Sequence, residues 1–471
     1  MVRALVRTAL LVAFMAFATT GAMAQQVLER ADASLKGSLL VYPKIELRWQ
    51  CQGANCVLVQ DTFLSILNDC NRPVDVQLYF INGDPPLNAR FLGQPPNQVQ
   101  LDRAHEGWNW VDCQFTLTPD QPAYISLQTG LPRSTFQPTV GQPMCQPFES
   151  LDPGPPQGRL EIPPDDLPFS TRVLRGYVIA WAVDADAQSV NNQIRWNHLS
   201  GSAVLVHYPR GTAAEYSAYA FPAPFANDVG DQCGPETGNG LIVGTPGWLK
   251  LDGVDYAAPY DKLLFDFYAT TAPNPTLALS KANQAVILDT DITLHPVSTD
   301  VRQDGDGRVT TKAVFDIWNQ NEVRFSGTER CVSCWDQTLV SRYPAPNHML
   351  RANLQTDKGK ARINGVGSSV CVSPGLLRPA PLRPILPDPS ENASLLGITI
   401  KQLTFPPSVL SGATRHGRSA LNMVGQGEQP ANIRYDLVDT LRTGEETDEA
   451  GNVDGGEGVE IGTDSRIEDG E

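Results

Sequence analysis

Short segments of alternating apolar and polar residues are the feature that most constrains the fold of this chain. Apolar side chains occupy every second position in Ile45–Cys51, and Val74–Phe80 repeats the pattern. A period of two is typical of strands with one buried face. Glycine and proline, 39 and 38 of the 471 residues, favour many turns over long helices. We therefore predict a mainly β protein, built from tandem antiparallel β-sandwich (Ig-like) domains with long Pro/Gly-rich loops.

The strand patterns fall into groups that are separated by sequence without periodicity. Pro143–Pro168 is rich in Pro, Gly and Asp, and strand patterning resumes at Tyr177–Val183. The predicted units are residues 1–24 as a signal peptide, 35–142 as β-sandwich domain 1, 143–168 as a Pro-rich linker, 169–292 as β-rich domain 2, 293–410 as β-rich domain 3, and 411–471 as a poorly ordered segment with an acidic disordered tail from 443.

The N-terminus has the pattern of an export signal. Arg3 and Arg7 precede the apolar run Thr8–Ala18, and Ala22-Met23-Ala24 is a small-x-small cleavage site. The apolar run is too short to span a bilayer. We expect an exported protein of the periplasm, cell surface or extracellular space, with no transmembrane segment after signal cleavage.

The formal net charge of −16 is concentrated at the C-terminus. Residues 443–471 contain eleven acidic residues and one arginine, so this tail carries −10 of the total. The rest of the chain is close to balanced and shows no basic stripe. Nucleic acid is therefore excluded as an expected partner.

Nine cysteines in an exported chain indicate disulfides with one cysteine left over. Cys51 and Cys56 are close enough to close a small loop at a strand end. Cys70 and Cys113 lie in one predicted domain, where a disulfide would cross-link two strands. Sequence alone leaves the connectivity open.

The segment Cys331-Val332-Ser333-Cys334-Trp335 is the sharpest local motif. Haem attachment is excluded because Trp335 stands where a histidine is needed. A structural disulfide is favoured, from Cys331 or Cys334 to Cys371 or between the first two. Metal binding and a redox-active thiol remain the alternatives.

Catalytic and metal-binding motifs are absent from the sequence or incomplete in it. Asp304 and Asp306 match a calcium loop only in part, and the acid pairs Asp184/Asp186 and Asp289/Asp291 are read as solvent-facing strand ends. No H-E-x-x-H or G-x-S-x-G arrangement occurs. We expect no cofactor, leave metal binding open, and regard an enzyme as the less favoured reading.

Three tryptophans provide the only binding signal. Trp108 and Trp110 flank Asn109, and Trp196 precedes Asn197. Flat rings beside amides suit a sugar ligand, while core packing is the ordinary alternative for such residues. Trp108, Trp110 and Trp196 are therefore candidate ligand-stacking residues.

Four segments carry a resemblance to a known family. They are Gly37–Lys44, Gly107–Asp112, Cys331–Asp336 and Leu354–Arg362. Together they resemble a family of exported bacterial proteins of unknown function, over most of the mature chain. The resemblance implies export and assigns no activity, substrate or site residue.

These features favour a non-enzymatic, exported β-sandwich protein of the cell envelope or extracellular space, acting in adhesion, matrix or surface assembly. Envelope or extracellular proteins, or polysaccharide, are the expected partners. The alternative is a carbohydrate-binding module or glycan-active hydrolase that uses the tryptophans.

Overall fold

A computed structural model describes the chain over residues 36–52, 55–84, 110–130, 159–161, 170–183, 193–223, 243–244, 249–251, 253–260, 262–269, 277–278, 285–297, 310–367, 394–405 and 414–426. In these ranges the helical turns are η2 (Tyr208–Arg210), η4 (Val340–Arg342) and α4 (Arg351–Leu354), and strands dominate. The predicted mainly β class with antiparallel sheets is confirmed. The immunoglobulin-like topology stays a prediction, and the predicted signal peptide and acidic tail lie outside the described residues.

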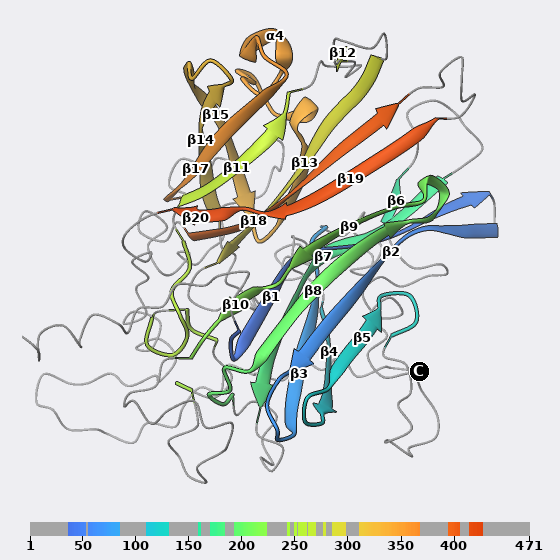
Figure 1. Cartoon of the computed structure of the whole chain (residues 1–471), viewed down its shortest axis with the longest axis vertical. Coiled ribbons are helices and arrows are strands. Elements are labelled where there is room, and N and C mark those ends of the chain that lie inside the picture. The colour runs from blue at the N-terminus through green and yellow to red at the C-terminus, as the bar shows by residue number, and fades with distance from the viewer. Residues whose placement is uncertain are drawn as a thin grey trace, which may run out of the picture.

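The first strands form a ten-stranded antiparallel sheet folded over itself, which we call the N-terminal sandwich (Figure 1). Its order is β4-β3-β7-β1-β2-β8-β9, with β10 beside β1, β5 beside β2 and β6 beside β7. Strand β2 connects the two layers, because its first half pairs with β1 and its second half with β8 and β5. The strands are β1 (Leu39–Gln52), β2 (Asn55–Asn68), β3 (Val74–Asn82), β4 (Trp110–Leu117), β5 (Pro122–Ser126), β6 (Arg159–Glu161), β7 (Ser170–Val183), β8 (Leu199–His207), β9 (Thr212–Ser217) and β10 (Tyr219–Phe221).

A bulge interrupts β1 in the middle of this sheet. Tyr42 pairs with Val178 and Ile45 with Gly176, so Pro43 and Lys44 together stand opposite one residue of β7. Proline has no N–H for the ladder and is tolerated at such bulges. Because a bulge bends the strand and turns its side chains, it changes the direction in which Lys44 points.

The later strands form two five-stranded sheets that we call the C-terminal sandwich. One sheet has the order β15-β14-β17-β11-β20, and the other has β12-β13-β18-β19 with β16 beside β13. Phe265, Phe315 and Ile363 from the first sheet pack with Ile292 and Leu294 from the second in one buried core. The strands are β11 (Lys262–Tyr268), β12 (Leu277–Ala278), β13 (Ala285–Val297), β14 (Thr310–Asn319), β15 (Arg324–Ser333), β16 (Asp336–Leu339), β17 (Lys358–Gly367), β18 (Ser394–Phe405), β19 (Arg415–Asn422) and β20 (Val424–Gln426).

The sheet that contains β13 and β18 is buried on both faces. One face contributes Ile292 and Leu294 to the C-terminal core. The other contributes Leu396, Ile398 and Ile400 to the core cluster of the N-terminal sandwich. A strand covered on both sides needs a nearly continuous apolar sequence, which the start of β18 has.

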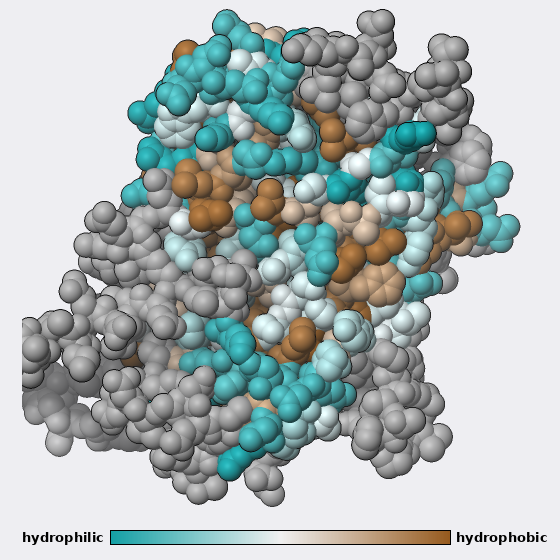
Figure 2. All heavy atoms as spheres, in the orientation of Figure 1, coloured by the Kyte–Doolittle hydropathy of each residue, from teal (hydrophilic) through white to brown (hydrophobic). Residues whose placement is uncertain are grey.

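The two sandwiches meet along an extended interface. Strand β19 runs beside β9 (Figure 1), where the Asn422 side-chain amide donates to the Ser217 carbonyl at 2.7 Å. The Tyr219 hydroxyl, from β10, is within hydrogen-bond distance of the carbonyls of Gly397 (2.8 Å) and Met423 (2.7 Å). On the side of the molecule shown in Figure 2, hydrophobic surface is concentrated in the middle, and hydrophilic surface covers the end that β14, β15 and β17 form.

Strand pairing divides the chain differently from the three predicted domains. Strands β7 to β10, placed in domain 2, complete the sheet of domain 1, and β11 belongs with the last strands. Arg159–Glu161 of the predicted linker forms β6. The predicted poorly ordered segment from 411 contains β19 and β20. The expectation of poor order is corrected for these two strands, which pair with β18 and β11, β19 also lying beside β9. Residues 411–413 and 427–471 of that segment lie outside the described residues.

Candidate functional site: a buried charged cluster between the sandwiches

A lysine from the N-terminal sandwich is buried against the C-terminal sandwich. Lys44 lies in the β1 bulge, and its side chain has no exposed surface. Its Nζ is 3.2 Å from Asp291 Oδ2 and 3.2 Å from Thr293 Oγ1, both on β13. Asp291 and Thr293 are two positions apart on the strand, so both project from the β13 face toward β1.

A second carboxylate approaches the same lysine from β1. Glu46 Oε2 lies 3.9 Å from Lys44 Nζ. The other Glu46 oxygen accepts hydrogen bonds from Arg48 Nη2 at 2.6 Å and Nε at 2.9 Å. We call Lys44, Glu46, Arg48, Asp291 and Thr293 the interface cluster.

Burial and charge act against each other on the ionisable groups of the interface cluster. Burial lowers the pKa of Lys44, and the neighbouring Asp291 and Glu46 carboxylates offset only part of that effect. For Glu46 burial would raise the pKa, but the charges of Arg48 and Lys44 outweigh it and hold the pKa well below its usual range. The Glu46 carboxylate is therefore ionised, whereas the protonated form of Lys44 is disfavoured by its surroundings.

Several buried polar atoms around the interface cluster have no hydrogen-bond partner among the described residues. The Gln337 side-chain amide donates to Asp291 Oδ2 at 2.5 Å. Asp291 Oδ1 and Gln337 Oε1 accept no hydrogen bond from any residue of the described ranges, and Arg418 Nε and Gln60 Nε2 likewise find no acceptor there. An unsatisfied buried polar atom costs about 1–3 kcal/mol, so these atoms destabilise the folded state.

Backbone contacts hold the bulge in place on both sides. The Trp335 indole N–H donates to the Pro43 carbonyl at 2.7 Å. The Tyr216 hydroxyl donates to the Lys44 carbonyl and accepts from the Lys44 amide at 3.1 Å. Trp335 is 3% exposed. The backbone of both bulge residues, Pro43 and Lys44, is thus held by hydrogen bonds.

A buried histidine extends the contact along β13. His295 is fully buried and its ring lies 3.9 Å, centroid to centroid, from the ring of Tyr177 on β7. Its Nδ1 is 2.8 Å from the Cys334 carbonyl, and because a carbonyl only accepts, Nδ1 carries the proton. Burial lowers the pKa of His295 to about 4, so the ring is neutral at pH 7.

The acid pair Asp289/Asp291 is predicted to face solvent, but the structure shows Asp291 buried and Asp289 half-buried. Asp291 is buried and bonded to Lys44. Burial raises the pKa of Asp289 to about 6, and Ser341 donates to its carboxylate at 3.2 Å. In the described residues no group of three or more His, Cys, Asp or Glu is placed to hold a metal ion. The pairs Asp184/Asp186 and Asp304/Asp306 lie outside the described residues.

The predicted stacking tryptophans do not form a site in the described part of the chain. Trp196 is 5% exposed and its indole N–H donates to Asn68 at 3.1 Å, so the prediction of a ligand-stacking role is corrected to core packing. Trp110 begins β4, but its side chain lies outside what is described, as does Trp108.

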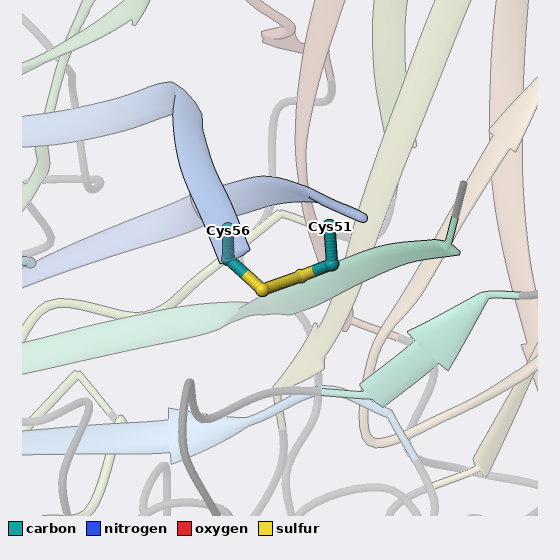
Figure 3. The surroundings of a disulfide bond; sticks show 2 residues. All are labelled: Cys51 and Cys56. Carbon is teal, nitrogen blue, oxygen red and sulfur yellow. A yellow bond between two sulfur atoms is a disulfide. The ribbon is translucent and has the colours of Figure 1, made fainter. Parts of the chain in front are cut away.

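The predicted close cysteine pair forms a disulfide. Cys51 and Cys56 face each other across the β1–β2 hairpin and are joined by an S–S bond of 2.03 Å (Figure 3). Cys70, Cys113 and Cys331 are also disulfide-bonded. Cys334 is buried and carries a thiol. Cys371, the predicted partner in the third domain, lies outside the described residues.

Sequence reasoning missed Lys44 and Glu46. The available signal was the interruption of the β1 alternation at Pro43-Lys44, which is typical of a bulge, but nothing local identifies Asp291 as the partner. The residues are 247 positions apart.

The fold and the interface cluster define a mainly β protein of two antiparallel sandwiches joined through buried charges. No protein-family model matches the chain, and no curated protein is found to be related to it. Among the helices described, none has the length and apolar character required to cross a bilayer.

Proposed function

We propose that this is an exported, non-enzymatic protein of the cell envelope or extracellular space, acting in adhesion, matrix or surface assembly. The observation that supports this most is the buried interface between the sandwiches, with Lys44–Asp291 and Trp335–Pro43 contacts across it. Two units joined in this way resist relative motion, which suits a component that transmits force or spaces other molecules. Disulfide-bonded cysteines support an oxidising compartment.

The proposal is tested by locating the protein and its partners. The full-length chain is expressed in a bacterial host, which is separated into cytoplasm, periplasm, outer surface and medium. We expect the mature chain, cleaved after Ala24, outside the cytoplasm. Purified mature protein is then applied to intact cells and to isolated envelope with a homobifunctional cross-linker, and saturable capture by an envelope or matrix component supports the proposal.

A glycan array separates this function from the carbohydrate alternative. The same mature protein is applied to the array together with Trp108→Ala and Trp196→Ala variants. Saturable glycan binding that is lost in Trp108→Ala but kept in a correctly folded Trp196→Ala variant would replace the assembly proposal with a carbohydrate-binding function. Retention of the chain in the cytoplasm would contradict both.

A further inference from the structure

The interface cluster places an amine against a carboxyl group in a buried site. Lys44 Nζ lies 3.2 Å from Asp291 Oδ2, and their side chains are 0% and 6% exposed. Oδ2 is bonded to Cγ, the carbon that the amine would attack, so this hydrogen bond holds Nζ beside the reacting carbon. The two backbones are held in place by strand pairing: β1 pairs with β10 and β7 before the bulge and with β7 and β2 after it, and Asp291 itself pairs with β16 and β18.

We propose that Lys44 and Asp291 form an isopeptide bond that joins the two sandwiches covalently. The product is an amide between Lys44 Nζ and Asp291 Cγ, with one water molecule released. The reaction needs no oxidant, reductant or cofactor. It is independent of the proposed function, since it follows from the interface cluster alone.

The proton movements balance within the interface cluster. One proton passes from the Lys44 ammonium to the Asp291 carboxylate, which leaves a neutral amine and a carboxylic acid. The Nζ lone pair adds to Cγ, and a bond forms between them. A second proton leaves Nζ through Glu46, whose Oε2 is 3.9 Å away, and reaches the departing hydroxyl. The Cγ–O bond breaks, and the oxygen leaves with both protons as water.

Surrounding groups favour this step. Burial lowers the pKa of Lys44 and thus promotes the neutral, nucleophilic amine. The Gln337 amide donates to Asp291 Oδ2, where negative charge develops when Cγ becomes tetrahedral. Thr293 Oγ1 accepts from Nζ and holds the amine in place. Arg48 orients Glu46 through its other oxygen, so Oε2 is left for proton transfer.

The product also removes unfavourable features of the starting arrangement. Two buried charges become one neutral amide, which ends the cost of keeping ions out of water. Asp291 Oδ1, the buried oxygen without a hydrogen-bond donor among the described residues, is the atom that departs. Because the site is buried, water to reverse the reaction is scarce.

Peptide mapping tests the bond directly. The exported full-length chain is purified, unfolded, reduced, alkylated and digested with trypsin. We expect no cleavage after Lys44 and one branched peptide that contains Lys44 and Asp291, lighter by one water than its two parts. Recovery of the two peptides separately, at their unmodified masses, from folded protein would overturn the proposal.

Three variants and an internal control make the result specific. Lys44→Met must abolish the branched peptide. Asp291→Asn must still give it at the wild-type mass, because an asparagine releases ammonia in place of water. Glu46→Gln must leave most chains unlinked, with folding confirmed by circular dichroism. Lys401 and Asp266, an ion pair whose carboxylate is 52% exposed, must be recovered unlinked, and their linkage would identify the amide as a preparation artefact.

Discussion

The indole N–H of Trp335 donates to the carbonyl of Pro43 at 2.7 Å, although 292 residues separate the two. Trp335 follows the Cys331–Cys334 motif, and Pro43 begins the β1 bulge, so the contact joins two segments that stand out in the sequence. The Trp335 ring also lies so close to Gly83 that a Cβ there would come within 2.4 Å of it. Trp335 is therefore a point of attachment between the sandwiches.

Replacing Trp335 with phenylalanine should destabilise the protein. The Pro43 carbonyl would be left buried without its donor, and the smaller ring would leave a gap, for a combined loss of about 2–4 kcal/mol. The free energy of unfolding is measured by urea denaturation. Trp318→Phe is the matched control, because Trp318 is half-buried on the outer face of β14, where Arg324 and Arg362 lie over its ring, and its loss should be much smaller. Equal losses for the two variants would contradict the assigned role of Trp335.

Gly176→Ala should be strongly destabilising. A Cβ at Gly176 would lie 1.9 Å from the Ile81 carbonyl oxygen, and a backbone atom cannot move aside without disturbing the β3–β7 ladder. We expect a loss of about 3 kcal/mol or more. Gly417→Ala is the control, because its nearest contact would be Leu403 at an ordinary 3.6 Å, and it should be neutral or slightly stabilising. Thermal unfolding followed by circular dichroism distinguishes the two.

Stability should fall in mild acid because of His295. Its folded-state pKa of about 4 lies below the usual 6.5, so the unfolded chain binds a proton first as the pH falls. The contribution of this group is complete above pH 6.5 and is lost as the pH falls to about 4. It amounts to at most about 3.5 kcal/mol, at about 1.4 kcal/mol per pKa unit.

Urea denaturation at a series of pH values checks this effect. His295→Gln should flatten the profile between pH 6.5 and 4. His416→Gln should flatten it less, because His416 is only half-buried, although burial and the charge of Arg210 lower its pKa in the same direction. Asp289 acts in the opposite direction, because its raised pKa of about 6 makes the folded state bind a proton before the unfolded state does. The comparison is therefore made between variants rather than from the wild-type slope. An unaltered profile in His295→Gln would refute the assignment.

Thiol labelling should distinguish the two cysteines of the Cys331–Cys334 motif. Cys334 has no exposed surface and carries a thiol, whereas Cys331 is disulfide-bonded. Iodoacetamide without reductant should spare Cys334 in the native protein and label it after unfolding. Cys331, Cys51 and Cys56 should be labelled only after reduction. Labelling of unreduced Cys331 would contradict the disulfide. Proteolytic digestion of the unreduced protein then identifies the peptide linked to Cys331, which we predict to contain Cys371.

The local features of the fold were predictable from sequence. Alternation in Val74–Phe80 predicted a strand, and β3 covers Val74–Asn82. Cys51 and Cys56 are five positions apart, so a tight hairpin alone brings them together. Trp196 was harder, because a tryptophan beside an amide has the same sequence pattern in a core as on a ligand surface, and only burial decided between the two readings.

Strand alternation and cysteine spacing in the sequence determined that this protein is mainly β and where a hairpin is closed by a disulfide, because both depend on neighbours along the chain. Tertiary structure alone decided which strands share a sheet, since β7 pairs with β1 across more than a hundred residues while nothing local marks the partner. It also decided that Lys44 meets Asp291. That contact arises because a bulge in β1 and the doubly buried β13–β18 sheet face each other, and neither strand's sequence specifies what lies opposite.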